Sequence, residues 1–567
     1  MARLERGAHP DPRAGDDGRR RQSAADPRHA RHGQLRRIRA GGADAAAGRG
    51  AGGRAGLRGA SLRPRADGGA GDARLALHAG RRAGLAARGR HGADADGADR
   101  RRARRRGARD PRALSGGARA RHRHRESRMD GTRMDEAALC EALLAAAKAA
   151  GAEAADAIAV TGESLSAETR AGALEQAERA EGVDIGLRVI VGRRSAVVSA
   201  SDAAPDVIAA LAERGVAMAK AAPEDPYVGL ADAADLALPA LRDAAPLALD
   251  DPEGAPEAAM LERLALEAEA AATAVKGVSQ VEGAGASWSR RVMHLAASNG
   301  FRGGYARASA ALFVSAIAGE GLGMERDFRA ESRRAMAELP APDMIGREAG
   351  ERAVARLSPK RAPTGAWPVF FDERVSSSLV GHLIGAANGA SVARGSSWLK
   401  DRMGEAVLPK GLTLIEEPRR LAGPASRPFD AEGLATRETA FVQDGTLICG
   451  VLDLASARKL GLASTANAGR SPGGAPSPGV TNLRLLAEDP RPKADLLREM
   501  GTGLLVTSMI GASINPNTGD YSRGASGFWV EGGEIAYPVN EITVAGNLNA
   551  MLASLRAADD ADPFRGA

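Results

Sequence analysis

The order of helical and strand patterns predicts an α+β fold with two domains. Helices with apolar residues at helical spacing are separated by pairs of strand-like runs, and the turns inside several of those pairs carry glycine. The regular strand–helix–strand alternation of a doubly wound parallel sheet is not part of this pattern. The last third of the chain is rich in glycine, proline and short strand-like runs. We therefore expect a helix-plus-hairpin domain over residues 129–340 and a mainly antiparallel β domain over residues 341–567.

Residues 1–128 are expected to lie outside this fold. They hold 34 Arg, no Lys and 13 acidic residues, a net charge of +21, and Ile38 is their only isoleucine, with no Val, Phe, Tyr or Trp. Such a segment cannot bury enough apolar surface to offset its ordering entropy. A basic nucleic-acid arm normally mixes Lys with Arg, and a transit peptide is short, rich in Ser and poor in acids. The residue set matches a wrong reading frame of GC-rich DNA, and we expect translation to begin at Met129 or Met134.

The remaining 439 residues are acidic. They hold 44 basic and 58 acidic side chains, a net charge of −14, which argues against direct binding to nucleic acid. They contain no signal-peptide pattern and no run of 18 apolar residues, so neither secretion nor a membrane span is expected. Cys140 and Cys449 are the only cysteines, too few for a disulfide framework or a thiolate metal cluster. A cytoplasmic location is therefore expected.

The first domain is predicted to begin with a helix. It starts at Asp135, has Leu139, Leu143 and Leu144 at helical spacing, and stops at Gly151. Further helices are predicted at 204–221 and 256–272, and strands at 157–160, 183–191, 196–199, 278–289, 292–298 and 308–319.

A helix over about 342–357 is predicted to lead into the second domain. There a short strand at 367–371 precedes a helix at 374–388. Gln443-Asp444-Gly445 and Gly532-Gly533 are turn signals between strands. The strands predicted in this domain are 412–415, 439–442, 447–452, 504–510, 527–530 and 534–536.

Histidine is scarce after residue 128, where only His294 and His382 occur. His294 lies in a strand-like run, where a structural role is favoured. His382 lies on the predicted helix 374–388. A catalytic zinc helix needs two imidazoles one turn apart and a carboxylate beside the first, and residues 376–381 supply neither. This helix is not expected to hold zinc by itself, and we assign no catalytic residue and no metal ligand.

Three polar, glycine-rich loops, at 388–398, 467–483 and 515–529, remain as candidates for a working surface. Turns and core caps would also explain their composition. None has the Gly-Lys-Ser/Thr ending or the strand-to-helix setting of a phosphate-binding loop. Ser522 and Ser526 are disfavoured as nucleophiles because no His or Lys lies near them in sequence.

The third loop is the candidate for peptide binding. Its glycines permit close approach of another chain, and its amides are expected to pair with an extended peptide as an added strand. Tyr521 offers a flat apolar face, while Asp520 and Arg523 would either fix the peptide or pair with each other as a brace. The predicted substrate-binding residues are Asp520, Tyr521, Ser522, Arg523, Gly524, Ser526 and Gly527.

These loops resemble the PmbA/TldE branch of the TldD/PmbA family, which is also called modulator of DNA gyrase. The resemblance rests on the motifs at 518–531 and 537–548, on Ser477-Pro478-Gly479-Val480-Thr481-Asn482-Leu483, and on Gly381-His382 with its continuation at 388–391. It covers the chain from about Met134 onward.

The resemblance implies a function and a partner. In the TldD branch the corresponding helix carries an H-E-x-x-x-H zinc motif, and placing its last His on His382 puts Ser377 and Ser378 at the first His and the Glu. The resemblance therefore implies a subunit with no metal or cofactor of its own, paired with a zinc-bearing TldD-like subunit. Such a heterodimer would cleave unfolded peptides, in peptide maturation and antitoxin turnover. The alternative is a regulator that binds DNA gyrase and has no role in peptide cleavage.

Overall fold

The first half of the molecule is built on a large antiparallel sheet. The computed structural model describes residues 2–6 and 134–561. Six long strands form the sheet in the order β4-β3-β2-β5-β6-β7. They are β2 (Ala154–Arg170), β3 (Ala173–Val191), β4 (Arg194–Ala200), β5 (Val278–Ala297), β6 (Arg302–Ala318) and β7 (Glu325–Arg333).

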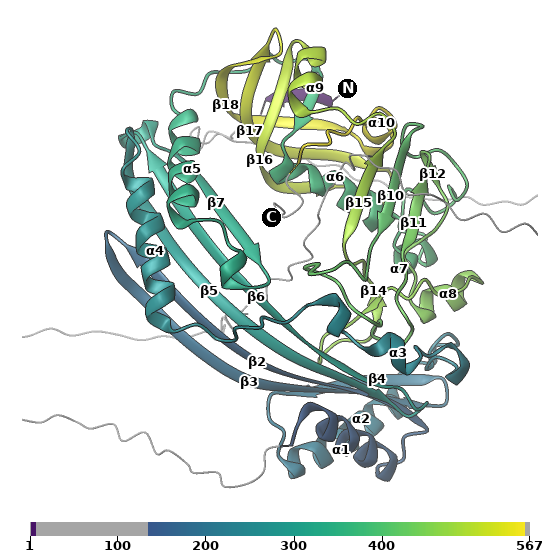
Figure 1. The fold of residues 1–567 in the computed structure, drawn as a ribbon. Helices are drawn as coiled ribbons and strands as arrows, with labels where there is room; N and C mark the ends of the chain where they lie inside the picture. The colour runs from purple at the N-terminus through teal and green to yellow at the C-terminus, as the bar shows by residue number, and fades with distance from the viewer. Residues whose placement is uncertain (1, 7–133, 562–567) are drawn as a thin grey trace, which may run out of the picture. The chain divides into compact units, whose positions relative to one another are not determined.

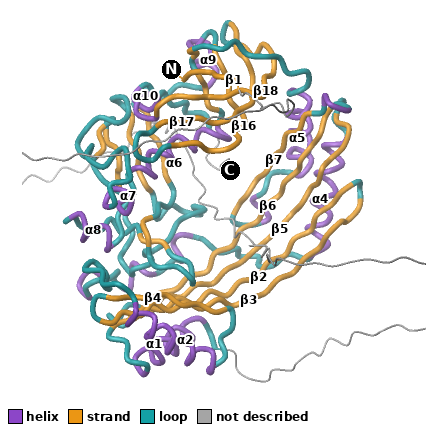
Figure 2. The backbone as a smooth tube through the Cα atoms, turned by 180° about the vertical axis from the view of Figure 1, so that it is seen from behind, coloured by secondary structure: helices purple, strands orange, loops and turns teal. Residues whose placement is uncertain are grey.

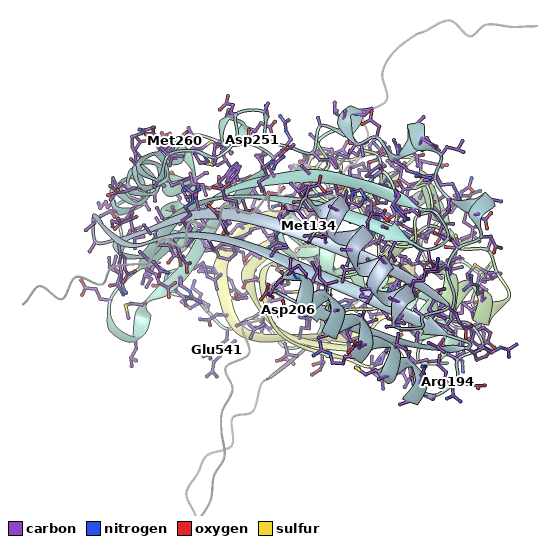
Figure 3. All side chains as sticks on the ribbon, turned by 90° about the horizontal axis from the view of Figure 1, so that it is seen from below. Met134, Arg194, Asp206, Asp251, Met260 and Glu541 are labelled. Carbon is purple, nitrogen blue, oxygen red and sulfur yellow. The ribbon has the colours of Figure 1, made fainter. Side chains whose placement is uncertain are left out.

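Four helices cover one face of this sheet (Figure 1, Figure 2). They are α1 (Glu136–Ala149) and α2 (Pro205–Ala221) at one end, and α4 (Ala258–Thr273) and α5 (Pro342–Ala355) at the other. Strand residues at alternate positions, such as the paired Ala157 and Leu187, are buried beneath α1 and α2. Figure 3 views this helical layer from below, with Asp206 in the first turn of α2. No helix in the described part of the chain is long and apolar enough to cross a membrane.

A second six-stranded sheet organises the other half, in the order β8-β1-β18-β17-β16-β9. Its strands are β1 (Ala2–Arg6), β8 (Ala366–Trp367), β9 (Val369–Phe371), β16 (Gly503–Ile514), β17 (Asp520–Glu531) and β18 (Glu534–Asn547). β9 pairs parallel with β16, whereas the long strands β16, β17 and β18 pair antiparallel.

Smaller elements complete this half. The helices are α6 (Glu373–Ala386), α7 (Gly389–Ala393), α8 (Leu454–Leu460), α9 (Lys493–Met500) and α10 (Leu548–Ala553). A four-stranded sheet, β12-β11-β10-β15, contains β10 (Leu412–Glu416), β11 (Thr439–Gln443), β12 (Thr446–Leu447) and β15 (Leu483–Ala487), and β13 (Ala468–Gly469) pairs with β14 (Ser477–Pro478). The α+β class and the antiparallel character of the second half are confirmed.

Two findings differ from the expected domain limits. Residues 2–6 form β1, which pairs antiparallel with β18, although the sequence placed all of 1–128 outside the fold. A strand adds to an edge through its backbone, so composition does not reveal it. The expectation for residues 7–128 lies outside the described residues. Helix α5, expected at the start of the second domain, packs with α4 through Ile345 and Ala349 on the first sheet.

The strands of the first sheet are longer than their apolar patterns. The runs predicted at 278–289 and 292–298 are one strand, β5, because Arg290 and Arg291 continue the pairing through a polar stretch. The first half of β3 was missed, because residues 173–182 are exposed on both faces and show no alternation.

A buried ion cluster joins the two halves. Asp156 on β2 accepts a hydrogen bond from Arg188 Nε at 2.6 Å and is paired with the guanidinium of Arg470, which comes from the loop after β13. The side chains of Asp156 and Arg470 are 4% and 1% exposed. Beside them, a Cβ on Gly186 would lie 2.0 Å from the carbonyl oxygen of Pro472. The loop after β13 is therefore seated directly on the first sheet.

A buried acidic pair lies next to this cluster. Glu432 lines a small cavity together with Asp156 and Arg188, and its carboxylate accepts a hydrogen bond from Leu454 N at 2.8 Å. Burial, followed by the charge of Asp430, raises the pKa of Glu432 from 4.5 to about 8, against the opposing effect of Arg188. Burial also raises the pKa of Asp430. Burial at the junction therefore favours the protonated form of this acidic pair.

We predict that Asp156→Ala lowers the free energy of unfolding by about 3–5 kcal/mol, because two buried guanidinium groups lose their carboxylate. Urea denaturation of both proteins measures the change. The matched control is Glu282→Ala, which removes the exposed partner of Arg326 and should cost less than about 1 kcal/mol. Equal losses of unfolding free energy in the two variants would contradict the conclusion that the buried ion cluster stabilises the fold.

We predict that the melting temperature falls as pH rises through the neutral range, and that Glu432→Gln weakens this dependence. The folded-state pKa of Glu432 is raised, so its protonated form contributes stability below about pH 4.5, and this contribution is lost as pH rises through about 8. Melting curves between about pH 5 and about pH 9 test this. Parallel pH profiles for the two proteins would show that Glu432 is ionised in the fold.

Candidate functional site

The first turn of α6 is fixed to both halves of the molecule. Asp372 caps the helix and accepts hydrogen bonds from Arg374 N and from Lys493 Nζ, the latter at 2.7 Å. Arg374 Nη1 donates to Asp327 Oδ1 of β7 at 2.9 Å. Burial opposes ionisation of Asp372, but the Lys493 ammonium outweighs it and holds the pKa of this carboxyl group below its usual range. Helix α6 therefore has a defined position relative to the first sheet.

The two faces of α6 differ. Leu379 and Leu383 are buried in the core of the second half. Gly381 and Gly385 are exposed, and a Cβ on either would have no atom within 4 Å. Ser378 is half-buried, and its hydroxyl donates to Val375 O at 2.6 Å. The face that contains Ser378, Gly381 and Gly385 is therefore lined by small side chains and open space.

His382 is the imidazole of this face. It is half-buried and meets the ring of Tyr521 edge-on, with 5.8 Å between ring centroids. Its Nε2 is buried and has no hydrogen-bond partner among the described residues. Burial and then the nearby charge of Arg523 lower the pKa of His382. The imidazole is consequently neutral at neutral pH.

The donor set around α6 does not fit a zinc ion. A catalytic zinc takes three protein ligands from His, Cys and carboxylates. At α6 the positions one turn from His382 are occupied by Ser377 and Ser378, and the Ser378 hydroxyl is engaged with its own helix. Within residues 2–6 and 134–561, no group of three or more His, Cys, Asp or Glu side chains lies close enough to bind a metal ion.

The predicted substrate-binding residues all fall on β17, and this changes their interpretation. β17 lies between β16 and β18, so its backbone amides are already paired on both sides. The expectation that a peptide adds to this segment as a strand is therefore wrong. The strand contains a β-bulge, and the glycines and asparagines in and before it are typical of turns. Its sequence therefore has the pattern of a loop.

The side chains of this group do not converge on one point. Tyr521 is 2% exposed in the core, where burial raises its pKa to about 12, and its hydroxyl lies 3.5 Å from Met509 Sδ. Arg523 Nε donates to Gly511 O at 2.7 Å, and Asp520 is held by Thr518 and Asn547, so the expected pairing between Asp520 and Arg523 is not present. Ser526 accepts a hydrogen bond from Arg356 Nη2 at 2.7 Å. The structure thus brings Tyr521 and Arg523 to His382 and leaves Asp520 and Ser526 in other surroundings.

The other candidates have structural roles. Asn388 caps α7, and Arg470 belongs to the junction. The thiol of Cys140 donates to His294 O at 3.4 Å, and burial raises its pKa to about 12, so this thiol is inert. Sequence reasoning missed Asp327 and its bond to α6, because partners 47 residues apart leave no local signal.

Comparison with known proteins agrees with this architecture. Models of the PmbA/TldA metallopeptidase domain 1, central domain and C-terminal domain match residues 155–219, 250–357 and 364–566. The chain belongs to the PmbA/TldD family. A family member named metalloprotease PmbA, from Escherichia coli, is 39% identical over 388 residues, which cover 68% of this chain and 83% of the relative. A metalloprotease PmbA homolog from Haemophilus influenzae is 35% identical over 401 residues, or 70% and 85%.

Two solved structures share the fold. A Bacteroides thetaiotaomicron protein that carries the name modulator of DNA gyrase aligns with a TM-score of 0.68 at 25% identity, over 75% of this chain and 94% of that one. TldE from Thermococcus kodakarensis aligns with a TM-score of 0.64 at 19% identity, covering 74% and 93%.

We predict that Tyr521→Ala destabilises the protein by about 3–5 kcal/mol, because it opens a cavity in the core beneath α6. Tyr521→Phe keeps the ring and should cost less than about 1.5 kcal/mol. Thermal and urea denaturation measure both. A near-normal stability of Tyr521→Ala would indicate that the ring is exposed, as a peptide-contacting residue requires.

Proposed function

We propose that this PmbA/TldD protein is the non-metal-binding subunit of a TldD/TldE-type heterodimeric zinc peptidase that acts on unfolded peptides. One observation carries the proposal. Helix α6 presents Ser377 and Ser378 beside His382, in the place where the family's zinc motif would need an imidazole and a carboxylate. The zinc is assigned to a TldD-like partner, and this chain contributes a wall of the site.

The open face of α6 suits that role. Ser377, Ser378, Gly381 and Gly385 lie at helical spacing on this face and leave room for the backbone of another chain. His382 is neutral there, and Arg523 supplies a positive charge nearby. Such a wall contacts a peptide chiefly through shape and its backbone, which is consistent with substrates that share no sequence.

The anchoring of α6 supports the same role. The helix is tied to the first sheet through Asp327 and to α9 through Lys493, so its open face has a fixed position. A subunit that completes a partner's site needs this rigidity, because small displacements of positioning groups reduce catalysis strongly. On the basis of the family relationship, we propose that the heterodimer acts in peptide maturation and antitoxin turnover.

Two of the solved relatives are named modulators of DNA gyrase, which keeps a gyrase-binding regulator as the second candidate. Affinity purification from native extract distinguishes the two. The peptidase proposal expects a TldD-like chain in stoichiometric amount. Recovery of gyrase without such a chain would contradict the peptidase proposal and favour the gyrase-binding regulator.

We predict that the isolated chain binds less than about 0.1 zinc per molecule and cleaves no peptide, because a three-ligand site is not available at α6. Metal analysis by mass spectrometry and a chelator-sensitive peptidase assay measure these properties.

The double variant Ser377→His/Ser378→Glu provides a control. It should remain inactive, because the third ligand and the hydrogen bonds that orient the ligands would still be missing. One tightly held zinc in the unmodified chain would contradict the assignment of the metal to the partner.

A further inference from the structure

A cavity of about 560 Å³ lies behind α6. Ser376 and Val380 face this cavity, whereas Ser378 and His382 are displaced from them by two residues, or about 200° around the helix. The cavity is therefore separate from the open face described above. Its volume falls within the range of sites for small ligands, about 300–1,000 Å³.

Apolar side chains form most of the cavity wall. They come from β9, α6, β15, α9, α10 and the segment that follows α10. Among them are Val369, Phe370, Phe371, Val380, Leu496 and Ala557.

Charged groups also line the cavity, among them the acidic Glu373 and Asp560, and the Asp560 carboxylate accepts a hydrogen bond from Lys493 N at 2.9 Å. The other charged groups are neutralised in pairs. Lys493 is bonded to Asp372 at 2.7 Å. Glu499 is paired with Arg491 at 2.5 Å and also with Arg556. An uncharged apolar ligand would leave these pairs intact, whereas a charged one would compete with them. The apolar side chains and the ion pairs together favour an apolar, uncharged occupant.

One wall is an open strand edge. β9 is the last strand of its sheet, and the two residues that flank it also bond to β16. Leu504 N donates to the Pro368 carbonyl, and the Asp372 amide donates to Val506 O. Because neighbouring residues of a strand alternate in direction, the amide and carbonyl groups of Val369 and Phe371 point away from β16. In the described part of the chain β9 pairs with β16 alone, so these four groups have no strand partner there. An extended peptide offers the matching donors and acceptors.

The cavity follows this edge. Phe370 packs on one face of the sheet with Leu497 and Leu505, whereas Val369 and Phe371 pack on the other face with the main core of the second half. All three line the cavity. A cavity that reaches both faces of an edge strand lies alongside the edge itself, where a further strand would be added.

We propose that this cavity binds a short, extended, uncharged apolar peptide segment. The segment pairs with the backbone of Val369 and Phe371 and places its side chains on both sides of β9. β9 has three residues, or about 10 Å of strand, so the site holds three or four peptide residues. Because the occupant is a peptide of the unfolded substrate, this proposal rests on the proposed function, to which it adds a contact site separate from the open face of α6.

The test uses the peptide Ala-Val-Phe-Val-Ala-amide, with fluorescein attached to its N-terminal amine through a flexible spacer, and the isolated full chain. Fluorescence anisotropy should give saturable binding below about 1 mM. The same peptide with alternate amides N-methylated on the edge that faces β9 should bind about tenfold more weakly, because it cannot complete the strand pairing. No saturation by about 1 mM, or equal affinity of the methylated peptide, would overturn the proposal.

Two substitutions locate the site. Ala557→Trp fills the cavity and should weaken binding about tenfold, whereas Ala553→Trp, on the exposed face of α10, should leave it unchanged. Melting curves check that both variants fold. If Ala557→Trp binds normally, the peptide binds elsewhere and the assignment is wrong. If the full chain does not bind the peptide but a chain without residues 562–567 does, the chain's own tail is the occupant instead and the proposal is overturned.

The binding assay is independent of catalysis. It is carried out without a partner, so a failure to bind leaves the proposed function standing. Conversely, failure to recover a TldD-like chain would refute the proposed function without changing the measured affinity.

Discussion

The buried contact of Asp156 with Arg188 and Arg470 is the constraint on which the rest of the structure depends. It places a carboxylate of the first sheet between a guanidinium of the same sheet and one from the second half. Separating the halves would leave charges without partners in a desolvated place, which costs several kcal/mol. Gly186 lets the backbone at Pro472 approach the sheet, so the ion cluster and the close packing act at the same point.

A second group of ion pairs and hydrogen bonds holds α6 against the first sheet. Asp327 of β7 holds Arg374, the second residue of α6, and Arg356 connects the same carboxylate to Ser526 of β17. The helix therefore keeps a defined position although its zinc-motif positions are serines.

The sequence predicted the parts of the fold that leave local signals. Periodic leucines located α1, and glycine turns located the hairpins β3–β4, β11–β12 and β17–β18. It could not locate Asp327, Asp156 or Arg470 as partners, since their contacts span tens to hundreds of residues. Tyr521 was misplaced for a related reason. Glycine and asparagine around it indicated a loop, but pairing on both sides makes the segment a central strand.

Zinc-edge anomalous scattering from crystals of the chain in complex with a TldD-like partner tests the central claim most directly. The account predicts one strong peak per heterodimer, bound entirely by side chains of the partner subunit. It also predicts that the Nε2 atom of His382 is not a ligand. A zinc peak within bonding distance of His382, or a second peak on this chain, would contradict it.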